Sequence, residues 1–147
     1  MALAQLDFYS SVLHQPTRVN VILPEHYVNS ENKQGGHPIK KDFPVLYLLH
    51  GYNGDETVWM RWSNIERHCK TLPLAVVMVR GEHTFYIDSE QYDYFQFLSE
   101  ELPEKMKHFF PISTKREDTF IAGLSMGGYG AMHAALARPD MYSYAAS

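Results

Sequence analysis

Ser125 is the residue best placed to do chemistry in this sequence, within the Gly-Leu-Ser-Met-Gly segment at residues 123–127. A short apolar run at residues 119–123 leads into it, and a small-residue-rich segment with helical character follows at residues 126–137. Where a buried strand turns sharply into a helix, a serine is held with its hydroxyl above the carboxyl edge of the sheet. Flanking glycines are needed because the two backbones approach too closely for a Cβ. We therefore predict that Ser125 is a nucleophile, the alternative being a plain Gly/Ser turn.

A second segment, His-Gly-Tyr-Asn-Gly-Asp at residues 50–55, directly follows a buried apolar run at residues 44–49. Attack by a serine on a carbonyl places negative charge on the oxygen, which two N–H donors must stabilise. One donor is the residue after the nucleophile, and the other lies in the loop after an earlier strand. We predict the backbone N–H groups of Met126 and Tyr52 for these roles. The alternative for the second segment is a simple glycine-rich turn.

A serine hydroxyl also needs a base, and only His133 and Asp140 follow Ser125 as candidates for a base and its acid. In this type of site the acid and the histidine come after the serine in the chain. His133 lies eight residues along the predicted helix, about 12 Å from the turn, and cannot reach the hydroxyl. We expect His133 to pack on the helix and Asp140 to lie in a turn. The acid and histidine of the triad are therefore expected outside these 147 residues.

His83 is the only upstream candidate for a substitute base, because it follows the predicted strand at residues 74–79. The alternative, which we favour, is a pocket-lining or solvated loop residue. The other histidines lack zinc-site spacing, and the single cysteine, Cys69, offers no thiolate cluster, so we predict neither a metal nor a cofactor. We expect Trp59 and Trp62 to belong to the core.

Composition restricts the partners. The net charge of −4 and the pI near 6.0 give no electrostatic case for nucleic acid or an anionic membrane. No apolar run approaches the roughly 20 residues that a membrane-spanning helix needs. The N-terminus does not resemble a signal peptide, and a cytoplasmic protein is the simplest expectation.

The predicted elements alternate along a single domain, residues 1–147. An antiparallel strand pair joined near Gln15-Pro16 opens the chain, and Pro103 is expected to kink or break a long helix. The pattern predicts an α/β fold, a mostly parallel sheet with helices on both faces. The strands are expected at residues 4–9, 18–23, 44–49, 74–79, 119–123 and 142–147, the helices at 57–70, 93–110 and 126–137, and a loop at 28–42. The open edge at residues 144–147 predicts self-association into a homo-oligomer.

The chain resembles a family of α/β-hydrolase esterases that includes S-formylglutathione hydrolase (esterase D), feruloyl esterases, bacterial tributyrin esterases and mycolyltransferases. The tributyrin esterases are the most similar branch, and the likeness covers nearly the whole chain. It is carried by residues 47–52, 85–88, 100–103, 109–111 and 121–130. The resemblance implies an α/β-hydrolase three-layer sandwich that is incomplete at its C-terminus, with the same nucleophile and oxyanion groups. It also suggests that Phe85, Tyr86 and Asp88, with His83, line the pocket.

The expected function is therefore that of a serine carboxylesterase that hydrolyses short-chain acyl esters through an acyl-enzyme intermediate. The expected partner is a small-molecule ester. Two alternatives stay open. One is an acyltransferase or S-formylglutathione hydrolase of the same fold, and the other is a catalytically inactive fragment that acts as a binding or assembly module.

Overall fold

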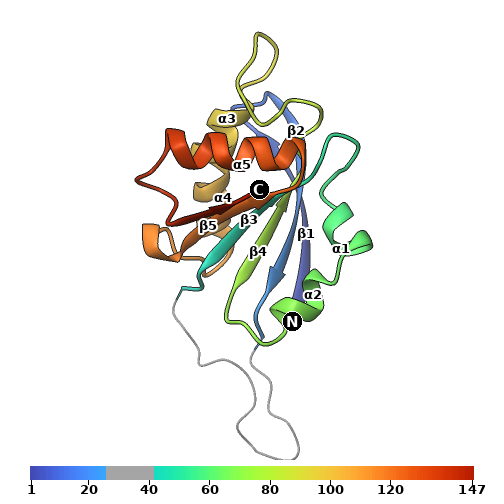
Figure 1. Ribbon diagram of the computed structural model, residues 1–147, viewed down its shortest axis with the longest axis vertical. Coiled ribbons are helices and arrows are strands. Elements are labelled where there is room, and N and C mark those ends of the chain that lie inside the picture. Colours follow the sequence, from blue (N-terminus) through green and yellow to red (C-terminus); the bar gives the residue numbers. More distant parts are fainter. Residues whose placement is uncertain (26–41) are drawn as a thin grey trace, which may run out of the picture.

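The computed structural model describes residues 1–25 and 42–147, which form one six-stranded sheet with helices on both faces (Figure 1). The strand order is β1-β2-β4-β3-β5-β6. The strands are β1 (Ala2–Ser10), β2 (Gln15–Leu23), β3 (Val45–Leu49), β4 (Ala75–Val79), β5 (Thr119–Gly123) and β6 (Tyr144–Ala146). β3 to β6 run parallel, whereas β2 pairs antiparallel with both β1 and β4. The loop predicted at 28–42 falls almost wholly outside the described residues.

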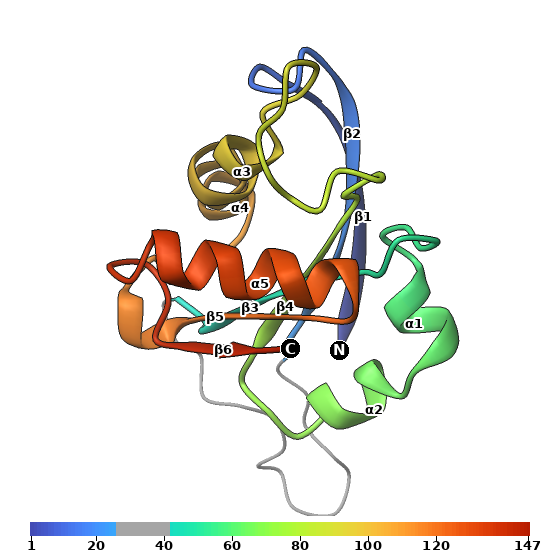
Figure 2. The ribbon, with the colours of Figure 1, turned by 45° about the horizontal axis from the view of Figure 1, so that its top comes forward.

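Helices cover the sheet unequally (Figure 2). One face packs against α5 and the long α3–α4 helix, and the other against the short pair α1 and α2. The helices are α1 (Val58–Trp62), α2 (Ile65–Cys69), α3 (Tyr94–Gln96), α4 (Leu102–Phe109) and α5 (Met126–Ala137). Strands β3 and β4 are buried on both sides because their side chains alternate between the two cores. The strands next to Ser125 are thus packed against helices on both faces of the sheet.

The strand-to-helix unit at the serine was predicted with its observed bounds, β5 at Thr119–Gly123 and α5 at Met126–Ala137. The predicted turn near Gln15-Pro16 is wrong. Both residues already belong to β2, where they pair with Ser10 and Tyr9. The turn lies at residues 11–14, because buried Leu13 anchors it and donates its N–H to the Ser10 hydroxyl at 2.9 Å.

The helix predicted over residues 57–70 is interrupted. Ser63 is extended, with φ −137° and ψ 173°, and separates α1 from α2. Its hydroxyl donates to the carbonyl of Trp59 and accepts the N–H of Ile65, so the side chain replaces helical backbone bonds. The physical reason for the break is this local competition by a serine.

The predicted break at Pro103 is not observed, because helical backbone continues through this residue in the first turn of α4. A single π-helical turn, η1 (Phe97–Glu101), joins α3 to α4 just before it. Proline has no N–H to donate to the carbonyl of Ser99, four residues earlier. That carbonyl instead accepts Arg138 Nη1 at 3.4 Å, so a guanidinium takes the position that the proline leaves open.

Candidate active site

Ser125 sits at the junction of β5 and α5 with its side chain exposed. Its backbone has φ 57° and ψ −116°, a conformation that L side chains rarely adopt. Such strain costs about 1–3 kcal/mol and persists only where the surroundings impose it. The turn therefore presents the hydroxyl to solvent, at the carboxyl edge of the parallel strands.

Gly123 and Gly127 are required by the closeness of the backbones at this turn. A Cβ on Gly123 would lie 2.2 Å from the Gly127 carbonyl, and one on Gly127 would lie 2.4 Å from the Leu49 oxygen. Both distances are far inside van der Waals contact. The glycines thus let α5 begin directly against β3 and β5, as the sequence pattern predicted.

The loop after β3 lies directly beside the serine. A Cβ built on Gly51 would be 3.6 Å from Ser125 Cβ and 3.4 Å from the Leu124 oxygen. Within the described residues, neither the Tyr52 N–H nor the Met126 N–H has an acceptor. Met126 is the first residue of a helix of 12 residues, whose N-terminus carries a positive partial charge. The arrangement brings an exposed hydroxyl and two unengaged amides to one place.

A cavity of about 250 Å³ opens beside the hydroxyl. Its walls are almost wholly apolar, and the only side-chain polar groups at its lining come from serine, asparagine, tyrosine and tryptophan. The lining residues are Gly51, Tyr52, Asn53, Gly54, Val58, Trp59, Trp62, Leu124 and Ser125. The core assignment of Trp62 is therefore wrong, since its side chain is 72% exposed at the cavity rim.

The four residues expected to line the pocket do not line this cavity. Tyr86 is fully buried, and the His83 ring stacks on Tyr52 with centroids 4.3 Å apart. Phe85 lies between Tyr52 and Tyr129, at 6.0 and 5.8 Å.

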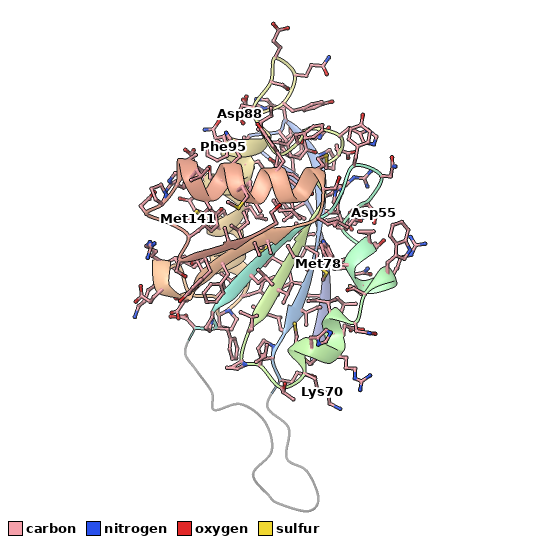
Figure 3. The ribbon with its side chains drawn as sticks, viewed as in Figure 1. Asp55, Lys70, Met78, Asp88, Phe95 and Met141 are labelled. Atoms are coloured by element: carbon pink, nitrogen blue, oxygen red, sulfur yellow. The ribbon has the colours of Figure 1, made fainter. Side chains whose placement is uncertain are left out.

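Asp88 has a different role. It lies beside Phe95 at the start of the α3–α4 helix (Figure 3). Its carboxylate accepts the N–H groups of Phe95 and Gln96 at 2.8 and 3.1 Å. It thereby caps the first turn of that helix.

His50 and Tyr86 lock the loop after β3 to the loop after β4. The Tyr86 hydroxyl accepts the N–H of His50 at 3.0 Å and donates to its carbonyl at 3.2 Å. The His50 ring accepts the N–H of Gly81 on Nε2 at 2.9 Å, so Nδ1 carries the proton and donates to the Gly51 carbonyl at 2.7 Å. Burial lowers the pKa of His50, which favours this neutral form.

The Tyr86 ring fits only because its neighbours are small. A Cβ on Gly81 would come within 2.2 Å of the ring, and one on Gly130 within 2.7 Å. Phe85 and Tyr86 both have left-handed backbones, with φ of 56° and 58°. Two consecutive strained aromatic residues turn Tyr86 inward, and nothing in the sequence marks that conformation.

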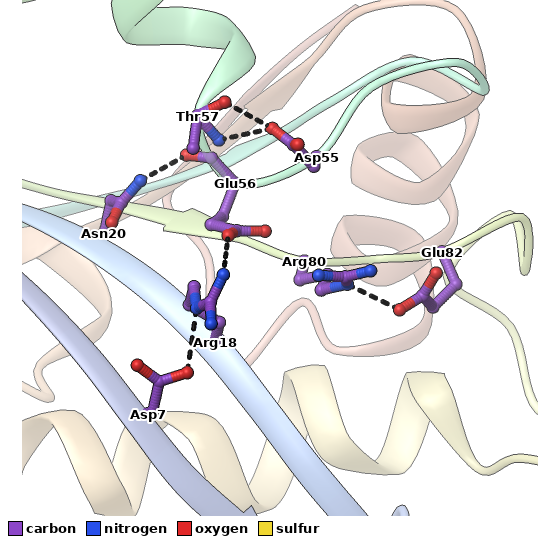
Figure 4. Close-up of polar contacts among 8 residues, drawn as sticks. All are labelled: Asp7, Arg18, Asn20, Asp55, Glu56, Thr57, Arg80 and Glu82. Atoms are coloured by element: carbon purple, nitrogen blue, oxygen red, sulfur yellow. Dashed lines mark hydrogen bonds and ion pairs between the residues drawn. The ribbon is translucent and has the colours of Figure 1, made fainter.

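The loop after β3 is anchored at its far end, just before α1, by buried Glu56 (Figure 4). Its backbone carbonyl accepts Asn20 Nδ2 at 2.9 Å, and its carboxylate pairs with Arg18 at 3.5 Å. Asp55 accepts the N–H and hydroxyl of Thr57 at 2.8 and 2.6 Å, and the hydroxyl bond lowers the pKa of Asp55. The segment bearing Tyr52 is thus fixed to the sheet at both ends.

No histidine or carboxylate in residues 1–25 and 42–147 hydrogen-bonds to Ser125. His133 packs between Phe95 and Tyr129 on α5, as expected of a packing residue. Asp140 lies in the turn after α5, paired with Arg138 at 2.9 Å. His83, stacked on Tyr52, does not hydrogen-bond to Ser125 either.

The described residues contain no group of three or more His, Cys, Asp or Glu side chains arranged to hold a metal. In the same part of the chain, no helix has both the length and the apolar character needed to cross a membrane.

The family model described as "Putative esterase" matches residues 10–147. An acetyl esterase of Caldicellulosiruptor saccharolyticus is 40% identical over 135 residues, which cover 90% of this chain and 50% of that protein.

Two solved structures from Staphylococcus aureus are each 35% identical to the chain. One is the substrate-bound fluorophosphonate-binding serine hydrolase FphF, with a TM-score of 0.85, covering 98% of this chain and 55% of that one. The other is the S-formylglutathione hydrolase FrmB without ligand, with a TM-score of 0.81, covering 97% and 54%. The chain thus spans about half the length of the relatives it matches.

Proposed function

Because this chain belongs to the esterase family whose model it matches, we propose that it carries the nucleophile and oxyanion site of a serine carboxylesterase. Ser125 attacks the carbonyl carbon of an ester, and the alcohol leaves as the acyl-enzyme forms. The N–H groups of Tyr52 and Met126 stabilise the oxyanion of each tetrahedral intermediate. Water then attacks the acyl group and releases the acid.

One observation carries this proposal. A strained, exposed serine at φ 57° lies within contact distance of the loop after β3, at a site where two amides lack acceptors. Loss of one oxyanion donor typically costs 10²–10³ in rate, about 3–4 kcal/mol. A plain Gly/Ser turn has no need of the strain, the exposed hydroxyl or the paired amides.

We further propose that the general base is not among the described residues, since no histidine or carboxylate among them hydrogen-bonds to the Ser125 hydroxyl. The chain is then one part of a single hydrolase domain whose acid and histidine lie elsewhere. Loss of the base costs about 10⁶ in turnover, nearly as much as loss of the whole triad. The proposed role of this part is to supply nucleophile, oxyanion site and pocket.

Short, uncharged acyl esters are the proposed substrates. The cavity beside Ser125 is small, and no charged side chain lines it. The relative named acetyl esterase supports a short acyl group. The neighbour named S-formylglutathione hydrolase favours a thioester as the second candidate, and comparison of matched oxygen and thiol esters separates the two. Transfer to an added alcohol acceptor, measured by product analysis, tests the acyltransferase alternative.

The experiment is a pre-steady-state assay of the chain with p-nitrophenyl acetate. We expect at most one p-nitrophenol per chain, released as a slow burst, followed by negligible turnover. The burst should be lost in Ser125→Ala and kept in Ser11→Ala, which removes an exposed serine of the hairpin turn. An equal burst in Ser125→Ala would exclude Ser125 as the nucleophile. Fast sustained turnover that depends on Ser125 would contradict the proposed absence of the base.

A further inference from the structure

Trp59 and Trp62 stand on one side of the cavity at Ser125, and they are the chain's only tryptophans. They are three residues apart in α1, so both project from one side of that helix toward the serine turn. Trp62 is 72% exposed. Its exposed indole, beside the proposed nucleophile, is open to contact with a bound ligand.

Trp59 is held rigidly against the serine turn. Its indole N–H donates to the Leu49 carbonyl at 3.1 Å, and the same oxygen accepts the N–H of Leu124 at 3.3 Å. One backbone carbonyl therefore fixes both the cavity wall and the residue before the nucleophile. The distance between Trp59 and Ser125 is thereby set by backbone geometry rather than by a flexible side chain.

Leu124, whose side chain is 62% exposed, and Val58 also line the cavity. A cavity of about 250 Å³ lies at the small end of ligand sites. An apolar slot of this size fits an unbranched chain of a few carbons. With no charged lining residue, it does not suit a carboxylate or an ammonium group.

The topology determines which half of an ester enters. The base must reach both the serine oxygen and the leaving alkoxide, so the alcohol lies on the side of the base. In this type of site the acid and the base follow the nucleophile in the chain, and β6, the next strand after β5, extends the sheet on the side away from β3. The cavity is lined by the loop after β3 and by α1, and β3 lies on the other side of β5 from β6. The acyl chain must then point toward the tryptophans.

We propose that Trp59 and Trp62 form the acyl-binding slot of this site and select neutral, straight acyl chains of a few carbons. This inference rests on the proposed function, because it names the group that the same site would bind. Trp62 closes over the chain at the rim, and Trp59 sets the depth.

Intrinsic fluorescence tests the slot without any catalysis, since both tryptophans line it. Titration with acetamide, butanamide and hexanamide should give saturable changes, with affinity rising about fourfold per added methylene. Binding should persist in Ser125→Ala. Trp62→Ala should abolish the gain with chain length, whereas Leu136→Ala, which removes a 77% exposed leucine away from the cavity, should keep it. A flat length dependence, or one that Trp62→Ala leaves unchanged, would overturn the proposal.

The assignment to the acyl side is tested with a constant leaving group. The ratio of burst rates for p-nitrophenyl hexanoate over acetate should fall at least tenfold in Trp62→Ala and stay constant in Leu136→Ala. An unchanged ratio together with retained amide binding would contradict the acyl assignment. If the unaltered chain and every variant show no burst while amide binding is intact, the proposed nucleophile is refuted and the proposed slot is not.

Discussion

Replacing Tyr86 with phenylalanine removes one oxygen from the contact that holds the oxyanion loop. In the native chain that oxygen accepts the His50 N–H at 3.0 Å and donates to the His50 carbonyl at 3.2 Å. Both backbone groups are buried, so the substitution leaves a donor and an acceptor without partners. Each such loss costs about 1–3 kcal/mol. We expect Tyr86→Phe to lower the free energy of unfolding by about 2–4 kcal/mol.

The matched control is Tyr142→Phe. Tyr142 is as deeply buried, but its hydroxyl has no partner among the residues that the structure describes. Removing it should change the free energy of unfolding by less than about 1 kcal/mol. Thermal and urea unfolding followed by circular dichroism measure both variants. With roughly 3–4 °C per kcal/mol for a chain of this size, Tyr86→Phe should lower Tm by about 6–16 °C.

A second measurement locates the effect. Amide hydrogen exchange should speed up across residues 50–54 in Tyr86→Phe, because local opening of that loop becomes easier. Equal destabilisation by Tyr86→Phe and Tyr142→Phe would refute the reasoning, since the two hydroxyl bonds of Tyr86 would then add nothing measurable to stability.

Three further outcomes are expected. The pKa of His50 is lowered by burial, so the free energy of unfolding should be full above about pH 6.5 and fall as the pH drops below it, by at most about 1.4 kcal/mol per pH unit. His50→Gln should flatten that fall. Urea titrations that show the same pH dependence in His50→Gln as in the native chain would contradict this. Ser125→Gly should raise the free energy of unfolding relative to Ser125→Ala by about 1 kcal/mol in the same assay, because glycine relieves the strain at φ 57°; equal stabilities would argue against strain. Gly127→Ala should lower the free energy of unfolding by at least about 1–3 kcal/mol, because its Cβ would meet the Leu49 carbonyl. Gly51→Ala, whose Cβ would make only ordinary contacts, should stay folded and show a much smaller loss of stability in thermal melts.

The sequence predicted correctly the elements whose residue pattern fits only one type of secondary structure. The apolar run before Ser125 and the small residues after it gave β5 and α5 with their observed bounds. The fold agrees with the two staphylococcal hydrolases, which confirms the α/β-hydrolase architecture. The glycine spacing was informative because a Cβ added at Gly123 or Gly127 would lie only 2.2–2.4 Å from neighbouring backbone atoms, which no other residue could tolerate.

The wall of the cavity could not be predicted by periodicity. Trp59 and Trp62 repeat at helical spacing with Ile65, which suggested a buried stripe. The Ser63 hydroxyl ends α1 instead, and Trp62 is left at the surface. The Ser63-Asn64 pair was the available signal, since both residues favour helix ends over interiors.

The pair of hydrogen bonds between His50 and Tyr86 could not be predicted from any local sequence pattern. It joins residues 36 positions apart through a buried hydroxyl, and it depends on left-handed backbones at Phe85 and Tyr86. Aromatic residues rarely adopt that conformation, so a sequence pattern favours the opposite. Long-range hydrogen bonds and strain are therefore the parts of this site that only the folded chain reveals.

The central claim is that the turn between β5 and α5 makes Ser125 the reactive serine of the chain. Prolonged incubation with a fluorophosphonate probe, followed by peptide mapping, tests it most directly. Oxyanion donors and binding alone can retain 10³–10⁴ of rate enhancement without the base, so the probe should label the peptide bearing Ser125 ahead of every other serine. Labelling spread evenly over exposed serines, or directed to a different one, would contradict the account.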